Sequence, residues 1–282
     1  MQRDCLRVSV FSDLHFHRDP QHRVPFPGAN YNIQRRARKI LERLADEQPE
    51  LAICAGDLVD VGSAESYPQL DSVFEDLSLS TRLAFTPGNH DRSSNLFADI
   101  GMIEPSERGQ ILGRQNYTIV RGVHHLIFLD SSPHKNVPGA SGEVGEEGRE
   151  WLKGTLQGMP EGHVAWIVTH YPTIPFSDLL PERARMVDGT EVHDLLKQFS
   201  SRIGAVIYGH IHHRHQHDAG EIAYLSMTPS SVPLICRIPG RGEFDEKGAL
   251  GFENLVLYPD KTFERTTKEI DVRDTVCDSP SR

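Results

Sequence analysis

Side chains that can bind metal ions recur in this chain directly after short apolar runs. In chain order they are Asp13 and His15, then Asp57, then Asn89, His90 and Asp91, then His170, and finally His210 and His212. The set combines carboxylate, imidazole and amide donors, and such mixed nitrogen and oxygen ligation suits Mn²⁺, Fe, Zn²⁺ or Co²⁺. It matches an all-oxygen calcium site poorly and a thiolate site worse.

Two pairs in this set are separated by a single residue. Asp13 with His15, and His210 with His212, have the i, i+2 spacing that places both side chains on one side of a strand end. Ile211 should then point to the opposite face, into the core. Together with Asp57, Asn89 and His170 these residues make seven candidate ligands, which are too many for one ion and suit two ions that share a bridging carboxylate. Glycines adjoin several of them and allow tight turns close to a ligand.

Short β-branched or aromatic runs predict the strands, and helical spacing of apolar residues predicts the helices. We predict strands at 6–11, 51–55, 82–86, 117–120, 125–130, 164–169, 205–208, 222–226 and 254–259. We predict helices at 32–48, 67–78, 145–158 and 190–200. This alternation indicates an α/β layered fold with a mixed sheet or two packed sheets. Ligands in such folds bind beyond the carboxyl ends of the strands, so neighbouring strands would bring the polar clusters to one site.

Length and composition suit one soluble domain. The chain has 282 residues, with 38% hydrophobic and 25% charged residues. We expect a domain over 1–270, an exposed loop at 239–251 and a flexible tail at 271–282. The net charge of −10 argues against nucleic acid and anionic membranes as partners. No signal peptide, no apolar run of about 20 residues and no CxxC pair are found, so we expect a cytoplasmic protein.

Five motifs in order give the sequence a family resemblance. They are D-x-H at 13–15, G-D at 56–57, G-N-H-D at 88–91, a lone histidine at 170 and G-H-x-H at 209–212. The chain resembles the calcineurin-like metallophosphoesterase family over about 200 of its residues, from Asp13 to His212. The resemblance implies a four-layer α/β/β/α sandwich of two mixed sheets, with a dinuclear metal centre at its edge.

The resemblance also implies a role for each motif residue. The first metal would be held by Asp13, His15, Asp57 and His212. The second would be held by Asp57, Asn89, His170 and His210, with Asp57 bridging. His90 would contact the phosphate, together with Asn89, and help the leaving oxygen depart, while Asp91 would orient His90. A metal-bound hydroxide would then attack phosphorus in line, with Mn, Fe or Zn as the expected ions.

The substrate is less constrained than the site. The segments AYLSMTPSSVP and LGFENLVLYPDKTF resemble the end of the bacterial class III cyclic-nucleotide phosphodiesterase group, which includes glycerophosphodiesterases. We therefore expect a small phosphodiester such as a cyclic nucleotide. The alternatives are a broad phosphomonoesterase or nucleotidase, and a non-catalytic binding scaffold on the same fold. Related diesterases often dimerise, so a homodimer is one expected assembly.

The histidine-rich stretch YGHIHHRHQH at 208–217 contains two kinds of histidine if the resemblance holds. His210 and His212 belong to the metal motif. His213, His215 and His217 have no place in it, and we expect them on a loop that leaves the site. His17 follows the first motif closely, and we expect it to be a bystander as well.

Overall fold

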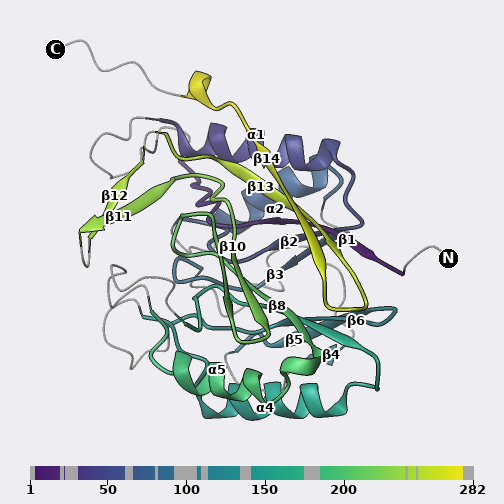
Figure 1. Ribbon diagram of the computed structural model, residues 1–282. Helices are drawn as coiled ribbons and strands as arrows, with labels where there is room; N and C mark the ends of the chain where they lie inside the picture. The colour runs from purple at the N-terminus through teal and green to yellow at the C-terminus, as the bar shows by residue number, and fades with distance from the viewer. Residues whose placement is uncertain are drawn as a thin grey trace.

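Two mixed β-sheets pack face to face, and each carries helices on its outer side (Figure 1). The computed structural model describes residues 4–19, 22, 31–60, 66–79, 82–91, 107–108, 114–133, 141–174, 185–238, 241–245 and 247–275. The architecture is the predicted four-layer α/β/β/α sandwich. None of the helices within these ranges is long and apolar enough to cross a membrane.

The first sheet has the strand order β14-β13-β1-β2-β3. Its parallel centre is β1 (Leu6–Phe11), β2 (Leu51–Cys54) and β3 (Leu83–Phe85). The strands β13 (Gly251–Leu257) and β14 (Phe263–Glu269) extend it in antiparallel fashion. The carboxyl ends of the three parallel strands therefore lie at one edge of this sheet.

The second sheet has the order β4-β5-β6-β7-β8-β10-β9. Its parallel part is β6 (His124–Phe128), β7 (Val164–Val168), β8 (Ile203–Tyr208) and β10 (Ile222–Ser226). Antiparallel strands flank it: β4 (Glu107–Arg108) and β5 (Tyr117–Arg121) on one side, β9 (His215–Ala219) on the other. A separate hairpin joins β11 (Leu234–Ile238) to β12 (Arg241–Phe244).

The helices divide between the two outer layers. Helices α1 (Ile33–Asp46) and α2 (Ser66–Asp76) share a core with the first sheet, and α4 (Gly145–Gly158) and α5 (Gly189–Lys197) share one with the second. Helix α1 begins where the side chain of Asn32 accepts a hydrogen bond of 2.8 Å from the amide of Arg35, a typical N-cap. The 3-10 turns η3 (Ser200–Arg202) and η4 (Arg273–Thr275) complete the elements described.

A third core lies between the two sheets and fixes how they face each other. Val10 and Ile53 of the first sheet, and Trp166 and Val168 of the second, are fully buried in it. Burying an aliphatic or aromatic side chain of this size stabilises the fold by roughly 1.5–3 kcal/mol. The packing of these side chains therefore fixes the position of one sheet relative to the other. The loops after β1, β2, β3, β7 and β8 are thereby placed at one rim of the sandwich.

Three expectations about polar segments need correction. The expected loop at 239–251 contains β12, and the expected loop after His212 contains β9. The expected tail is ordered at its start, because Thr275 is buried and its carbonyl accepts from the amide of Asn32 at 2.9 Å. Residues 276–282 lie outside the described part of the chain.

Candidate metal centre

The structure brings the seven candidate ligands together at the rim, in two adjoining groups. The first group is Asp13, His15, Asp57 and His212, whose ligand atoms all lie within 4.8 Å of one another. The second is Asp57, His170 and His210, under the same criterion. Asn89 adjoins the second group, with its Oδ1 atom 3.2 Å from His170 Nε2. Asp57 is the member shared by both groups.

The first group is buried and crowded. His15 Nε2 lies 3.1 Å from His212 Nε2 and 3.6 Å from Asp57 Oδ2. His212 Nε2 lies 3.5 Å from Asp13 Oδ1. Donor atoms packed at these distances around a common point are arranged as they would be around a small cation.

The second group is built on His170, which is completely buried. Its Nε2 atom lies 3.3 Å from Asp57 Oδ2 and 3.2 Å from His210 Nδ1. Burial is the main cause that holds the pKa of His210 well below its usual range. A neutral imidazole is the form that binds a metal ion, so this environment suits His210 as a ligand.

Backbone carbonyls fix the tautomers of two histidines, one in each group. His212 Nδ1 donates to the carbonyl of Val232 at 2.6 Å, and His170 Nδ1 donates to that of Ala55 at 2.8 Å. Because a carbonyl only accepts, each Nδ1 carries a proton, and Nε2 is the nitrogen that could bind a metal ion. This is the arrangement that a metal-binding histidine requires.

Three buried atoms indicate that the first group fits a cation. Asp13 Oδ2 is buried and finds no hydrogen-bond partner within the described ranges. Asp60 Oδ1 lies 3.3 Å from His15 Nδ1, which favours the proton on that nitrogen and a lone pair on His15 Nε2. The lone pairs of His15 and His212 then face each other at 3.1 Å. A bound cation would satisfy all three atoms, since buried polar groups left without partners are costly.

The backbone of the site adopts an unusual conformation. Asp13, His15, Asp57, His210 and His212 are in the left-handed region, with φ between 48° and 66°. Such residues cost of order 1–3 kcal/mol each and cluster at functional sites. The i, i+2 pairs therefore converge through left-handed turns beyond the strands, and not through the pleat of a strand as the spacing suggested. Ile211 is buried in the outer core, as expected.

Two glycines make room for the ligands. Gly56 has φ +93°, and a Cβ there would lie 2.2 Å from His170 Nδ1. A Cβ on Gly88 would lie 2.1 Å from Asp57 Oδ1. A side chain at either position would displace a candidate ligand.

His90 lies beside the first group and is held by Asp60, a residue that was not predicted from the sequence. His90 Nδ1 donates to the backbone carbonyl of Asp60 at 2.6 Å and lies 3.5 Å from its Oδ1. Burial opposes protonation of His90, but Asp60 and the charge of Asp57 raise its pKa to about 9. The only sequence signal for Asp60 was an acidic residue three positions after Asp57 in the same loop.

The expected contact of Asp91 with His90 is corrected by the structure. The carboxylate of Asp91 accepts from the amides of Gly88 at 2.9 Å, Leu58 at 3.2 Å and Val59 at 3.3 Å. It thus ties the loop after β3 to the loop after β2. Asp91 supports the site through the backbone, and Asp60 takes the position next to His90.

Asp91→Asn is expected to destabilise the fold by about 2–4 kcal/mol, because an amide is a weaker acceptor and one of its atoms can only donate. Urea unfolding followed by circular dichroism measures the loss. Asp76→Asn, at an exposed end of α2, is the control and should change stability by less than about 0.5 kcal/mol. Equal stabilities of the two variants would contradict this role of Asp91.

The remaining histidines of the run do not join the metal groups. His217 lies on β9 and stacks on Tyr224 with ring centroids 5.2 Å apart, and His215 lies on the same strand. His213 precedes the strand, and its carbonyl accepts from Ser226 Oγ at 2.7 Å. His17 stacks on His22, with centroids 3.7 Å apart, and His22 Nε2 lies 3.0 Å from Asp60 Oδ2.

Ser131, at the carboxyl end of β6, is a second supporting residue that the sequence did not reveal. Its Oγ accepts from the amides of His170 at 3.2 Å and Tyr171 at 3.1 Å. It therefore fixes the turn that presents His170. Nothing in the sequence distinguished this serine from one in an ordinary turn.

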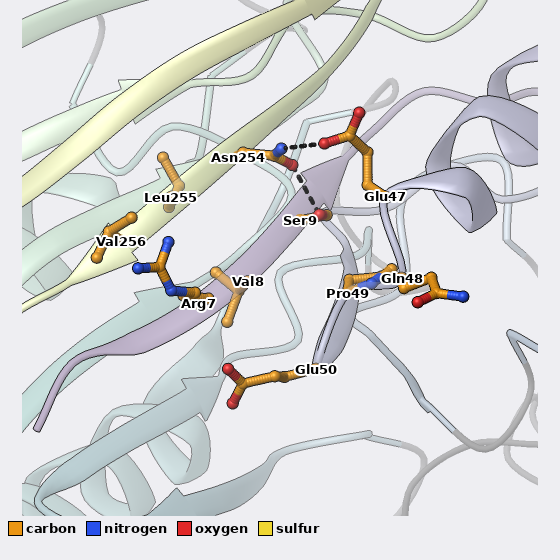
Figure 2. A pocket seen from close by; sticks show the side chains of 10 residues that line it. All are labelled: Arg7, Val8, Ser9, Glu47, Gln48, Pro49, Glu50, Asn254, Leu255 and Val256. Carbon is orange, nitrogen blue, oxygen red and sulfur yellow. Dashed lines mark hydrogen bonds between the residues drawn. The ribbon is translucent and has the colours of Figure 1, made fainter.

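A separate cavity of about 240 Å³ lies near the amino ends of β1 and β2, away from the metal groups (Figure 2). Three of its polar side chains are hydrogen-bonded to one another: Ser9 Oγ donates to Asn254 Oδ1 at 2.7 Å, and Asn254 Nδ2 donates to Glu47 Oε2 at 3.0 Å. None of the candidate metal ligands lines this cavity.

Known proteins share both the sequence pattern and the fold. A 3′,5′-cyclic-nucleotide phosphodiesterase of Nostoc sp. is 26% identical over 231 residues, which cover 81% of this chain and 80% of that protein. A probable glycerophosphodiester phosphodiesterase of Arcobacter nitrofigilis is 26% identical over 168 residues, covering 58% and 57%. The crystal structure of a dimetal phosphatase from Danio rerio superimposes with a TM-score of 0.64 at 12% identity, covering 93% of this chain and 98% of that one.

At that identity the structural likeness establishes the fold alone. The family assignment comes from the family model described as calcineurin-like phosphoesterase, which matches residues 6–214. That range includes every residue of the two metal groups. The chain is therefore a hydrolase of phosphoric esters and belongs to the calcineurin-like phosphoesterase family.

Proposed function

We propose that this protein is a dinuclear metal-dependent phosphodiesterase that hydrolyses a small phosphodiester, with a cyclic nucleotide as the leading example. The observation that carries the proposal is the position of Asp57, which belongs to both donor groups. A carboxylate shared in this way is the ligand that a pair of ions requires. Mixed imidazole and oxygen donors make Mn²⁺, Fe and Zn²⁺ the expected ions.

Two such ions would polarise the phosphoryl oxygens and acidify a water molecule near neutral pH. Asp13, His15, Asp57 and His212 would hold one, and Asp57, Asn89, His170 and His210 would hold the other. The positive charge needed by an anionic substrate would thus be local, on a chain whose net charge is −10.

His90 would assist the departing oxygen. Asp60 and the charge of Asp57 raise the pKa of His90 to about 9 in the metal-free chain, which favours the protonated imidazole. Asp60 engages the Nδ1 side, which leaves the Nε2–H to donate to the leaving oxygen of the ester. The side chain is 38% exposed, so a substrate in the rim can reach it.

A diester is favoured over a monoester by the relatives. Curated relatives named cyclic nucleotide phosphodiesterases align with 81% and 86% of this chain. The partial match to a glycerophosphodiester phosphodiesterase keeps that diester as a second substrate to test. The cytoplasm as location and a homodimer as assembly are further proposals; light scattering coupled to gel filtration tests the assembly.

Hydrolysis of model esters tests the function directly. With added Mn²⁺, the protein should cleave bis(p-nitrophenyl) phosphate faster than p-nitrophenyl phosphate, and should cleave cyclic AMP or a glycerophosphodiester. The Asp57→Ala variant, purified in the same way, gives the background from contaminating phosphatases. Faster monoester cleavage would indicate a phosphomonoesterase, and no turnover at any metal loading would indicate a non-catalytic scaffold. Elemental analysis of protein purified without chelator identifies the ions.

A further inference from the structure

The segment after β10 supports two candidate ligands at once. The Ser231 hydroxyl donates to the backbone carbonyl of Asp13 at 2.6 Å. The next carbonyl, that of Val232, accepts from His212 Nδ1 at 2.6 Å, and the Leu234 amide donates to the carbonyl of His212 at 2.8 Å. The position of this segment therefore sets both the path of the Asp13 turn and the tautomer of His212.

A buried arginine holds this segment from the other side. Arg36, on α1, donates from Nη1 to the carbonyl of Ser231 at 2.7 Å. Only 4% of Arg36 is exposed, so this cation is removed from water and depends on its protein partners. Its guanidinium lies over the ring of Tyr31, with the central carbon 3.3 Å from the ring centroid.

The same guanidinium reaches the last turn that the structure describes. Arg36 Nε donates to Thr275 Oγ1 at 3.3 Å. The turn is tied to the start of α1 independently, because the Asn32 amide donates to the Thr275 carbonyl at 2.9 Å. Thr275 is buried although it lies seven residues from the end of the sequence.

We propose that Arg36 is a positioning residue of the metal centre, and that it couples the turn η4 to the ligands Asp13 and His212 through Ser231 and Val232. The inference rests on the proposed function, since it concerns the same group of ligands. The guanidinium would not touch the ions. It fixes the carbonyl of Ser231, and the neighbouring carbonyl of Val232 fixes the imidazole of His212.

Groups that orient metal ligands typically change metal affinity 10–100-fold when they are removed. Arg36→Met keeps most of the buried stem and removes the donors. In Mn²⁺ titrations of metal-free protein by calorimetry, it should weaken binding at the first group 10–100-fold and approach the isotherm of His212→Ala. Arg36→Lys, which keeps a charged donor, should recover part of the affinity. Arg38→Met, on the exposed face of the same helix, is the control and should stay within about twofold of wild type.

A second readout does not require metal. Long-range ¹H–¹⁵N correlation spectra of the metal-free protein report which nitrogen of His212 carries the proton. Wild type should show a protonated Nδ1 on this residue, and Arg36→Met should show a mixture of tautomers. Thr275→Val removes the hydroxyl that accepts from Arg36 Nε and donates to the carbonyl of Val272, and it should shift the same signals in the same direction by a smaller amount. It also keeps the test available if Arg36→Met does not fold.

The proposal is overturned if folded Arg36→Met or Thr275→Val retains the wild-type tautomer of His212 and, for Arg36→Met, the wild-type Mn²⁺ affinity. That result differs from failure of the proposed function, in which the wild-type protein itself binds no metal or cleaves no ester. A purely structural role of Arg36 would lower the unfolding temperature without changing the tautomer of His212.

Discussion

Asp57→Ala is expected to abolish metal binding at both positions, and hydrolysis should fall to background. The reason is geometric: Asp57 Oδ2 lies 3.6 Å from His15 Nε2 in one group and 3.3 Å from His170 Nε2 in the other. If the proposed function holds, removing this carboxylate would take a ligand from both ions. Plasma mass spectrometry of the purified variant, followed by Mn²⁺ calorimetry, measures the loss.

Variants of ligands that belong to only one of the two groups are the matched controls. His212→Ala should weaken one metal position and spare the other, and His210→Ala should do the reverse. Burial opposes ionisation of Asp57, but the neighbouring histidines hold its pKa well below the usual range, so it is a carboxylate throughout the working pH range. An Asp57→Ala protein that folds and still binds one ion as tightly as wild type would refute the bridging role.

His90→Ala has the second-largest expected effect, and it should separate metal binding from turnover. His90 belongs to neither of the two groups that share Asp57, so the variant should bind metal at those groups with nearly wild-type affinity. Removal of a positioned general acid typically costs 10²–10⁴-fold in rate. The loss should grow as the leaving group becomes poorer, because a good leaving group departs without a proton.

A series of aryl phosphodiesters with leaving groups of increasing pKa tests this expectation. The dependence of log kcat on leaving-group pKa should be steeper for His90→Ala than for wild type. His163→Ala, which changes a histidine at the other end of the second sheet, should follow the wild-type line. Parallel lines for His90→Ala and wild type would mean that His90 does not assist the leaving oxygen.

The buried strands and helices could be predicted from the sequence, because burial of one face or of a whole strand sets the spacing of apolar residues along the chain. The predicted runs 6–11 and 222–226 and the predicted helix 145–158 have the same bounds as β1, β10 and α4. Strands β4, β9, β11, β12 and β14 were missed. Strands β9 and β14 show the reason. Each is an edge strand of sequence HQHDA or FERTTKE, and its order comes from pairing with a neighbour. No residue pattern reveals a partner that lies elsewhere in the chain.

The candidate ligands were also predictable, because their chemistry is carried by residue type and each follows an apolar strand. Their supporting residues were not. Asp60, Ser131 and Arg36 act through hydrogen bonds to groups that are distant in sequence or belong to the backbone. Asp91 is the opposite case. Its place next to His90 in G-N-H-D predicted a contact between the two side chains, but its carboxylate oxygens accept from three backbone amides instead.

The left-handed turns of the rim have a consequence for how the chain matures. Five ligands occupy a backbone conformation that is unfavourable for residues with a Cβ, and the metal-free chain has no bound cation to offset that cost. Any ion that binds the folded form alone stabilises it by mass action. If the chain binds the proposed ions, folding and metal acquisition would be linked, and a newly made chain deprived of its ions would unfold more often and be degraded sooner than a loaded one. Metal binding at the rim would then decide which copies of the protein persist, in addition to its role in the reaction.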